Sequence, residues 1–517
     1  MINIGDIIVG KFSANSSGSA YLVSNDLPKD IYIHAKNTNK SLHLDTVKVK
    51  VIPGNGRNIE GEVIEIIERF REEFVGVIQI SPRFAFFVPD SNKLPIDFFI
   101  PLSKIMGAKD GQKVIAKMTE WKDDAKNPNG EIIRVLGDAG EHETEIHSIL
   151  EAYSLPYSFE ADVIAEAETV SDVLLQSEID KRKDLRHVIT CGIDPIDSRD
   201  ADDTIGLEWI NGECFVSINI ADVSYYIRPE TELDKEAYNR GTSYYLVDRV
   251  IAMLPERISN NICSLKSGSD KLCFSGIFKL DSKGDIIDKW FGRTIVNVNK
   301  DYSYEEAQEV IENGVRIESK ETDLVIIELN KIAKKLRKER VKQGVLEINN
   351  QEIRFKLDSN NKPIDIVFKT QKDSNKLIEE FMLLANKEVA KVIKSKGYPC
   401  INRVHESPDE TKLNSLKDFV IQFGYSLNIN NSKEIKKSLN KLLNDSKGKP
   451  EENVISNLVT RTQQKAFYST KNIGHYGLGF KDYSHFTSPI RRYSDIMTHR
   501  LLGQALGNNG YPIKLLV

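Results

Sequence analysis

The chain has 517 residues, of which 40% are hydrophobic and 28% are charged, and its formal net charge is -5. This length predicts about three or four domains. The negative charge excludes a surface that is basic everywhere, so any contact with nucleic acid must use a local patch. No apolar run reaches membrane-spanning length and no signal-peptide pattern begins the chain, which predicts a cytoplasmic protein with no membrane partner. The five cysteines form no CxxC pair, which argues against a disulfide framework or a zinc ribbon.

The N-terminal part of the chain contains a weak internal repeat. Residues 10–12 resemble residues 76–78, and short strand-like runs follow each segment in the same order. Short strands at regular spacing are typical of small closed barrels. We therefore predict two barrels, over residues 1–69 and residues 70–137.

Aromatic residues occupy strand-like runs in both repeats. When such rings lie on the outer face of paired strands they can stack on nucleobases, while nearby lysines contact the phosphate backbone. Because side chains alternate between the two faces of a strand, each ring is equally a candidate for the barrel core. The four rings are Tyr21, Tyr32, Phe86 and Phe99.

The rest of the chain changes character twice. Residues 138–183 are first acidic and then helical, and we interpret them as a connector. Residues 184–517 combine strand-like and helical patterns, which predicts a mixed α/β catalytic domain. Its helices include an amphipathic segment over residues 322–344 and another over residues 374–397, with Ser374 as the candidate N-cap.

A dense acidic run begins this domain. The sequence DPIDSRDADD carries five aspartates in ten residues, and such carboxylates repel one another unless cations or protons offset the charge. Magnesium prefers oxygen ligands and commonly uses one or two protein carboxylates together with waters and substrate phosphates. The run therefore indicates a phosphate-handling site, and the alternative is a solvated acidic loop. Its aspartates are Asp194, Asp197, Asp200, Asp202 and Asp203.

A hairpin pattern follows the acidic run directly. Residues 204–210 and 213–218 are strand-like, and Asn211 and Gly212 between them are typical of a two-residue hairpin turn. The aspartates are therefore expected to enter a β-sheet, which would support them rigidly.

The second chemical motif is SPIRRY, over residues 488–493. Ser488 can cap a helix, and the proline after it suits the first helical position. Arg491 and Arg492 would then lie in the first turn, where the helix dipole disfavours cations unless an anion is near. A phosphate would supply that anion, and the alternative is a structural salt bridge to Asp482 or Asp495.

The acidic run, the SPIRRY motif and the stretch 241–245 leading to residues 253–255 together resemble the ribonuclease II/ribonuclease R family, most closely its ribonuclease R branch. The resemblance covers essentially the whole chain. It implies two N-terminal cold-shock-type OB β-barrels followed by a mixed α/β ribonuclease II-type catalytic domain. It further implies a monomeric 3′-to-5′ exoribonuclease that hydrolyses single-stranded RNA to nucleoside 5′-monophosphates by a two-metal mechanism, with Mg²⁺ or Mn²⁺ as cofactor.

The resemblance also implies roles for individual residues. The metal ligands would be Asp194, Asp200, Asp202 and Asp203, with Asp202 the most rate-determining. Arg491 would contact the scissile phosphate, a role that suits a planar and permanently charged guanidinium. Arg492 is a further RNA-binding candidate. Tyr245 and Ile348 would contact the terminal base, and Tyr304 with Glu379 or Glu380 would contact the terminal ribose.

The chain departs from the family pattern at several positions. Ile348 replaces the phenylalanine that clamps the terminal base, and Asn219 and Tyr225 stand where histidine is common. Family members continue beyond the SPIRRY helix, whereas this sequence stops at Val517, which predicts an incomplete catalytic domain and no C-terminal S1 barrel. These departures leave a second interpretation open, in which the chain is a shortened RNA-binding paralogue with weak or no activity.

Overall fold

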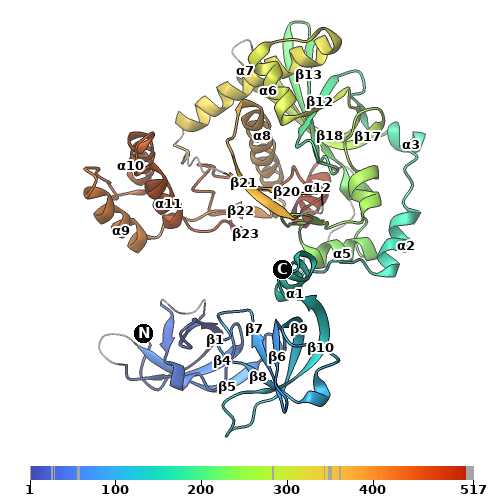
Figure 1. The fold of residues 1–517 in the computed structure, drawn as a ribbon. Helices are drawn as coiled ribbons and strands as arrows, with labels where there is room; N and C mark the ends of the chain where they lie inside the picture. Colours follow the sequence, from blue (N-terminus) through green and yellow to red (C-terminus); the bar gives the residue numbers. More distant parts are fainter. Residues whose placement is uncertain are drawn as a thin grey trace. The chain divides into compact units, whose positions relative to one another are not determined.

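The computed structural model describes residues 2–24, 27, 29–54, 59–281, 284–342, 344–346, 352–359 and 362–507. The chain forms two compact units, residues 1–157 and residues 158–517, coloured blue to teal and teal to red in Figure 1. Within the described ranges, no helix combines the length and the apolar character needed to cross a membrane.

The first unit contains two closed five-stranded barrels, as the internal repeat predicts. The first barrel has the strand order β1-β2-β3-β5-β4, and the second has β6-β7-β8-β10-β9, which is the same topology. The repeat in sequence is therefore a repeat in fold. The strands are β1 (Ile7–Ala14), β2 (Ala20–Val23), β3 (Ile31–Ile33), β4 (Thr46–Ile52), β5 (Glu60–Glu68), β6 (Glu73–Ile80), β7 (Ala85–Pro89), β8 (Phe98–Ile100), β9 (Gln112–Glu120) and β10 (Asn129–Asp138), and helix α1 (His142–Ala152) follows them.

The four predicted aromatic residues lie outside the barrel cores. Tyr32 lies between the buried residues Ile31 and Ile33, so strand alternation directs its ring outward. Tyr21 on β2 pairs with Tyr32 on β3, and their ring centroids are 5.5 Å apart. In the second barrel Phe86 and Phe99 are also register partners, with centroids 6.1 Å apart. The core alternative is therefore wrong for these residues, and each barrel carries an aromatic pair on its outer face.

The second unit is built on a seven-stranded sheet with the order β11-β18-β17-β14-β13-β12-β19. The hairpin after the acidic run is confirmed, because β13 and β14 pair antiparallel and the turn residues Asn211 and Gly212 have φ of 52° and 82°. Positive φ at both central positions is the geometry that Asn-Gly favours. The strands are β11 (Lys183–Asp184), β12 (Ile189–Asp194), β13 (Asp203–Ile210), β14 (Glu213–Ala221), β17 (Asp270–Leu280), β18 (Ile286–Asn297) and β19 (Lys300–Ser303).

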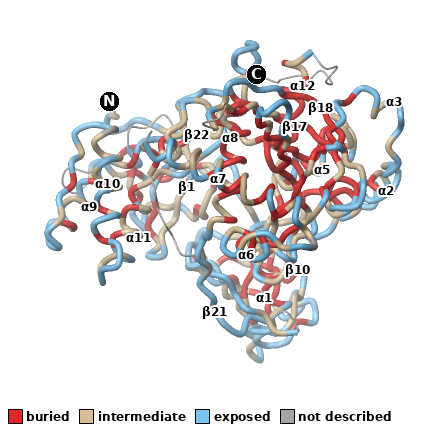
Figure 2. Tube along the Cα trace, turned by 90° about the horizontal axis from the view of Figure 1, so that it is seen from above, coloured by how far each residue is buried: buried red, intermediate tan, exposed pale blue. Residues whose placement is uncertain are grey.

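Helices bury the sheet. A large apolar cluster joins its strands to α6, α7 and α8, and a second cluster includes residues from α2, α5 and α12. Figure 2 shows this concentration of buried residues around α8, β17 and α5. The predicted amphipathic helices are thus confirmed as core elements, although Lys372 rather than Ser374 is the N-cap of α8. The helices named so far are α2 (Ala161–Thr169), α5 (Glu232–Arg240), α6 (Tyr304–Asn313), α7 (Lys320–Lys342), α8 (Asp373–Ser395) and α12 (Tyr493–Ala505).

Smaller elements complete the second unit. Helices α9, α10 and α11 enclose an apolar core of their own. Within the described residues, β15 with β16 and β20 with β21 form hairpins, and β22 pairs with β23 across the three helices between them. These elements are α3 (Gln176–Ile179), α4 (Val223–Tyr226), α9 (Glu410–Ile421), α10 (Ser432–Ser446), α11 (Glu452–Thr462), β15 (Tyr244–Tyr245), β16 (Val250–Ile251), β20 (Glu352–Leu357), β21 (Pro363–Lys369), β22 (Asn402–Val404) and β23 (Phe467–Ser469).

Candidate functional site

The acidic run occupies one end of the seven-stranded sheet. Asp194 is the last residue of β12 and Asp203 is the first residue of β13, so both lie where these antiparallel neighbours meet the loop between them. Asp202 lies in that loop and is only 5% exposed. Asp197 is exposed, as a solvated loop residue would be. The solvated-loop alternative is therefore wrong for the buried part of the run.

Hydrogen bonds from a distant segment hold the loop in place. The Ser264 hydroxyl donates to the Arg199 carbonyl at 2.8 Å and accepts from the Ala201 amide at 3.1 Å. The Leu265 amide donates to the Ala201 carbonyl at 2.9 Å, and the Ala221 amide at the end of β14 donates to the Asp202 carbonyl at 2.9 Å. The carboxylates on this loop are thus positioned before any ligand binds, which is the condition for preorganised electrostatics.

Burial makes negative charge unfavourable at these carboxyl groups. It raises the pKa of Asp202 to about 8 and the pKa of Asp194 to about 6, and neighbouring cations offset only part of the effect. Burial also raises the pKa of Asp200, and burial with the nearby charges of Asp194 and Asp202 raises the pKa of Asp203 well above its ordinary value. The cluster therefore holds more negative charge than the chain itself compensates, and it favours cations from outside.

Arg491 lies against the most buried of these aspartates. Its Nε is 3.4 Å from Oδ2 of Asp202, while the Ile490 amide donates to the other carboxylate oxygen at 2.8 Å. The Arg491 side chain is 40% exposed, and its Nη2 donates to the Ser488 hydroxyl at 2.9 Å. The guanidinium is thus fixed beside the acidic cluster and still open to an incoming anion.

Arg492 has a different environment. Its Nε and Nη2 donate to the two carboxylate oxygens of Asp495, each at 2.8 Å, and its side chain is only 19% exposed. The salt-bridge alternative therefore holds for Arg492 with Asp495, whereas Asp482 pairs with Lys394. Arg491 is therefore the more accessible of the two adjacent arginines, whereas the charge of Arg492 is neutralised by Asp495.

The predicted start of the last helix is wrong. Helix α12 begins at Tyr493 with Arg492 as its N-cap, not at Pro489 after a Ser488 cap. The reason is a tertiary contact: Arg492 is extended, with φ of -141°, and forms a β-bridge with Thr242. Both arginines therefore precede the helix instead of occupying its first turn, and the expected conflict with the helix dipole does not arise within the turn itself.

The segment that carries Tyr245 is fastened to Arg491. The Ser243 amide and the Thr242 hydroxyl both donate to the Arg491 carbonyl, at 3.0 and 2.9 Å. Tyr245 is 56% exposed at the end of β15, and burial of its hydroxyl together with the nearby Asp200 charge raises its pKa to about 12. The exposed ring therefore lies beside the acidic cluster and remains neutral at ordinary pH.

The predicted ribose-contacting residues lie on two helices that pack over the sheet. Tyr304 is the first residue of α6, and burial, with the charges of Asp203 and Asp194, raises its pKa. On α8, Glu380 is buried and ion-paired with Arg340, whereas the Glu379 side chain is 42% exposed. Glu379 is thus the more accessible member of the pair. Ile348 lies outside the described residues.

One cation near the acidic cluster, Lys266, is not predicted from the sequence. The Lys266 ammonium lowers the pKa values of both Asp194 and Asp200, against the larger effect of their burial. Lys266 also lines a pocket of about 360 Å³ together with Ser198, Arg199, Glu256, Asn260 and Asn261. No motif marks this residue, and the bonds of the preceding Ser264 and Leu265 to the acidic loop bring it there. Asn219, which stands where histidine is common in the family, is buried in the sheet, and its side-chain amide forms hydrogen bonds with Thr204, Ser217 and Ser275.

The carboxylates of the run fit divalent ions only as partial ligands. No three of these aspartates, all of them described, offer oxygens that lie within 4.8 Å of one another. An all-protein cage for a single ion is thus not formed, but magnesium typically combines one or two carboxylates with waters and substrate phosphate oxygens. Such open coordination fits Asp194, Asp200, Asp202 and Asp203.

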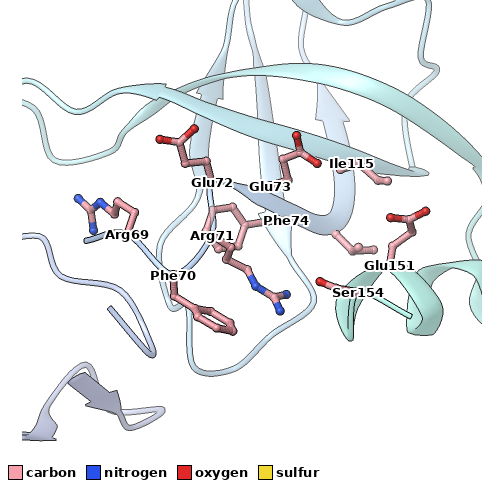
Figure 3. Close-up of a pocket in the computed structure, with 10 residues that line it drawn as sticks. Arg69, Phe70, Arg71, Glu72, Glu73, Phe74, Ile115, Glu151 and Ser154 are labelled. Atoms are coloured by element: carbon pink, nitrogen blue, oxygen red, sulfur yellow. The ribbon is translucent and has the colours of Figure 1, made fainter. Parts of the chain in front are cut away.

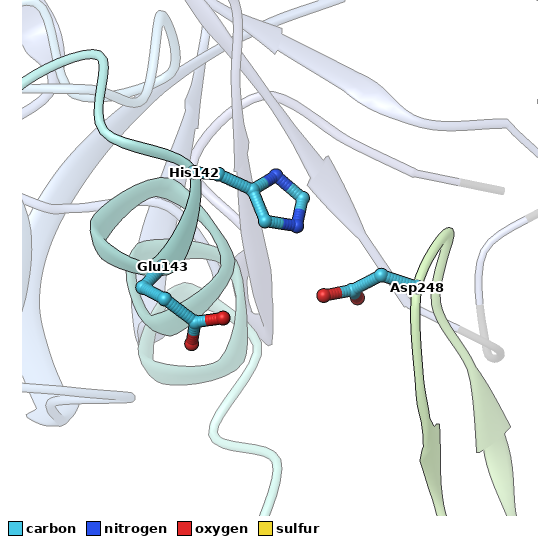
Figure 4. A group of neighbouring side chains, drawn as sticks. All are labelled: His142, Glu143 and Asp248. Carbon is cyan, nitrogen blue, oxygen red and sulfur yellow. The ribbon is translucent and has the colours of Figure 1, made fainter. Parts of the chain in front are cut away.

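Two other features of the chain do not compete for this role. Figure 4 draws His142 and Glu143 at the start of α1 and Asp248 between β15 and β16, and because these belong to different units they form no site within either one. A pocket of about 560 Å³ lies in the first unit (Figure 3), where Arg71 already donates to the Ala152 carbonyl at 2.7 Å and Arg69 is paired with Asp45. Glu72, Glu73 and Glu151 share its wall with these arginines, so the pocket carries charges of both signs.

Comparison with known proteins agrees with this architecture. The RNB domain model matches residues 182–508, the cold shock domain model matches residues 86–160, and the ribonuclease B OB domain model matches residues 10–66. These matches confirm the predicted order of two barrels followed by a ribonuclease II-type domain.

Individual relatives extend the agreement. Ribonuclease R of Thermotoga maritima is 36% identical over 514 residues, which cover 98% of this chain and 72% of that protein. The structure of Mycoplasma genitalium RNase R in complex with ribose methylated single-stranded RNA superimposes with a TM-score of 0.90 at 26% identity, over 96% of this chain and 79% of that one. An Arabidopsis thaliana protein named inactive exonuclease DIS3L2 is 35% identical, over 84% of this chain and 44% of that protein.

Proposed function

The chain belongs to the ribonuclease II/ribonuclease R family, and we propose that it is a metal-dependent 3′-to-5′ exoribonuclease that hydrolyses single-stranded RNA to nucleoside 5′-monophosphates. The observation that carries the proposal is the arrangement of Arg491 against Asp202 at the buried end of the sheet. A guanidinium, which suits phosphate, therefore lies beside an undercompensated acidic cluster, and phosphodiester hydrolysis needs both kinds of group.

Each charged group then has a separate task. Arg491 holds a non-bridging oxygen of the scissile phosphate and stabilises the charge that develops there, because a fixed guanidinium needs no reorganisation. Asp194, Asp200, Asp202 and Asp203 would hold divalent ions, which would activate the attacking water and supply Lewis-acid stabilisation of the phosphate. Water gives up one proton as it adds to phosphorus, the bond to the 3′ oxygen of the preceding nucleotide breaks, and that oxygen takes up a proton to become the new 3′ end.

The terminal nucleotide is held by its base and its ribose. The exposed ring of Tyr245 stacks on the terminal base, a contact that tolerates every base because each has a π face. Tyr304 lies beside Asp203 and Asp194 at the start of α6, and Glu379 is partly exposed on α8. We assign both to the ribose hydroxyls, which distinguish RNA from DNA. The outward aromatic pairs of the barrels, Tyr21 with Tyr32 and Phe86 with Phe99, offer further stacking surfaces for the strand.

The test uses the full chain and one single-stranded RNA labelled at either end. With Mg²⁺ or Mn²⁺, 3′-labelled RNA should release labelled mononucleotide from the first moments, while 5′-labelled RNA shortens progressively. Excess chelator should stop both. Internal fragments from both labels, or hydrolysis that persists in chelator, would contradict the proposal. The matching DNA strand is the control for recognition of the ribose.

The similarity to a relative named inactive favours one alternative, an RNA-binding paralogue without hydrolysis. Against it stand the four aspartates and Arg491, all of which are present and assembled in this chain. The same experiment separates the two functions. An RNA-binding paralogue would retard the labelled RNA in a gel and release no mononucleotide with either metal.

A further inference from the structure

The pocket beside the acidic loop has an unusual electrostatic composition. It measures about 360 Å³, at the lower end of the roughly 300 to 1,000 Å³ that small-ligand pockets occupy. Arg199 and Lys266 on its wall make no ion pair and no side-chain hydrogen bond with any residue in the described part of the chain. In the larger pocket of the first unit, by contrast, Arg69 has Asp45 and Arg71 has a backbone carbonyl.

Two cations without ion-pair partners beside five aspartates call for an explanation. If their role were to neutralise the acidic run, they should approach its carboxylates, yet neither comes within the 4.0 Å of a salt bridge in the described residues. Arg491 does so at 3.4 Å. Arg199 and Lys266 are therefore available for an anion that occupies the pocket itself, with the side chains of Ser198, Asn260 and Asn261 as additional hydrogen-bonding groups.

The pocket is structurally continuous with the acidic cluster. Arg199 immediately precedes Asp200, and the Ser264 hydroxyl joins its carbonyl to the amide of Ala201. On the other side, the Ser267 amide and hydroxyl both donate to Asp301, at 3.0 and 2.9 Å, and Asp301 pairs in register with Gly192 of β12. The segment that carries Lys266 is thus fixed between the acidic loop and β19.

The local backbone also favours a binding role. Asn260 and Asn261 lie on the π-helix Arg257–Ile262, a form that is rare and frequently found at functional sites. The Lys271 ammonium donates to the Asn261 carbonyl at 2.7 Å, which fixes the end of this helix at the pocket wall. Glu256 stands on the same wall and contributes one negative charge.

We propose that this pocket receives the phosphate of the nucleoside 5′-monophosphate product as it leaves the acidic cluster. The inference rests on the proposed exoribonuclease function. Hydrolysis converts a phosphodiester with one negative charge into a monoester with about 1.5 to 2 negative charges at pH 7. Cations that lie beside the aspartates, without touching them, therefore attract the product more strongly than the uncleaved strand, and Arg199 and Lys266 give the monoester a place to go.

The direct test measures binding of 5′-AMP to the full chain by calorimetry, first without metal and then with Mg²⁺. Arg199→Gln and Lys266→Gln should each weaken 5′-AMP binding at least about tenfold, the size expected for one lost charge-assisted hydrogen bond. Glu256→Gln should strengthen binding, because it removes a like charge from the pocket wall. Lys235→Gln, on the exposed face of α5 and paired with Glu232, is the matched control and should leave affinity unchanged.

Inorganic phosphate and adenosine separate the sources of affinity. Phosphate should compete with 5′-AMP and adenosine should not, if the pocket recognises the monoester. Competition by adenosine alone, or unchanged 5′-AMP affinity in both glutamine variants, would overturn the inference. So would unchanged affinity in Glu256→Gln, which retains both cations and gives an answer even where the other variants fold poorly.

Kinetics distinguish this role from a part in cleavage. In single-turnover reactions, Arg199→Gln should lose less in cleavage rate than in 5′-AMP affinity, and in multiple turnover it should be less inhibited by added 5′-AMP. A large fall in single-turnover rate with unchanged 5′-AMP affinity would place Arg199 in the chemistry and overturn the proposal. If the parent chain bound 5′-AMP but released no mononucleotide from RNA, the exoribonuclease function itself would fail instead.

Discussion

Two buried aspartates on the same sheet have pKa values that are shifted in opposite directions. Asp222 follows β14 and pairs with Arg182 at 2.9 Å and with Arg293 at 2.5 Å, and these cations hold its pKa far below the usual range despite complete burial. Asp202 is one strand away, and its pKa rises to about 8 because Arg491 offsets its burial only in part. Since the Ala221 amide donates to the Asp202 carbonyl, the two environments are joined through one strand end.

A stable fold can hold a buried carboxylate with or without full neutralisation by the chain. At Asp222 the chain supplies its own counter-ions, so the carboxylate fastens β14 to β18 and needs nothing from outside. At Asp202 the chain supplies rigid support but only partial neutralisation, so we expect this site to attract external cations. The first arrangement is structural, and we propose the second as a binding site; burial alone does not distinguish them.

The sharpest test of this contrast is Asp202→Asn. It should reduce turnover roughly 10⁴-fold, about 5 kcal/mol, because a ligand to the ions and a fixed negative charge are lost together. RNA affinity should stay within a few-fold of the parent, since stacking and phosphate contacts are spread along the strand. Single-turnover hydrolysis and a filter-binding titration measure the two quantities. Near-parental turnover would show that the chemistry does not depend on Asp202.

The reciprocal change, Asp222→Asn, should act on stability. It leaves Arg182 and Arg293 without their buried counter-charge, so the free energy of unfolding should fall by about 3 to 5 kcal/mol. The folded pKa of Asp222 lies below its unfolded value, so its contribution is present above about pH 4 and is lost as pH falls towards the folded pKa. Denaturant unfolding at several pH values measures both effects. An unchanged unfolding midpoint would contradict the structural role.

The sequence indicates the role of the acidic run but not that of Asp222. The acidic run stands out because its members are consecutive, and Asn211 with Gly212 predicts the hairpin that supports it. Nothing local marks Asp222, because Arg182 and Arg293 are distant in sequence and meet it only in the folded sheet. Lys266 was missed for the same reason. Sequence patterns therefore predict sites that a short segment encodes and miss those that strand pairing assembles.

The same limit explains the errors at particular residues. The start of α12 was placed too early because Arg492 is held extended by Thr242, a contact that no helix signal in the SPIRRY segment reveals. Ser374 is a reasonable cap by residue type, but its amide bonds to Gln308 of α6 and its side chain is buried. Glu379 and Glu380 are equivalent in sequence and differ only because Arg340 lies over one of them more closely.

The adjacent arginines repeat the contrast within two residues. Arg491→Ala should reduce turnover by about 10² to 10³, the usual effect of deleting one preorganised contact to the transition state. Its control is Arg492→Ala, which breaks the pair with buried Asp495 and should lower the unfolding temperature before it affects single-turnover cleavage of the folded fraction. A larger loss of cleavage from Arg492→Ala, measured on folded protein, would reverse the assignment of the phosphate contact.

The smallest expected effect concerns two tyrosines, one beside the acidic cluster and one beside Asp222. Tyr245 lies near Asp200 with an open ring, whereas Tyr225 is covered by Arg182 and Arg228, at 5.0 and 4.9 Å from its ring centroid. Tyr245→Ala should weaken binding of a short RNA by about 1 to 3 kcal/mol through lost stacking, and Tyr245→Phe should retain the affinity because the ring remains.

Tyr225→Ala is the matched control for that measurement. It removes a ring that packs on the arginine paired with Asp222, so it should lower stability and leave RNA affinity unchanged. Fluorescence titration with an oligonucleotide and thermal unfolding of the same samples separate the two effects. If Tyr225→Ala weakened RNA binding as much as Tyr245→Ala, the surroundings of Asp222 and of the acidic cluster would belong to one RNA surface. Asp222 could then no longer be called structural in contrast to Asp202.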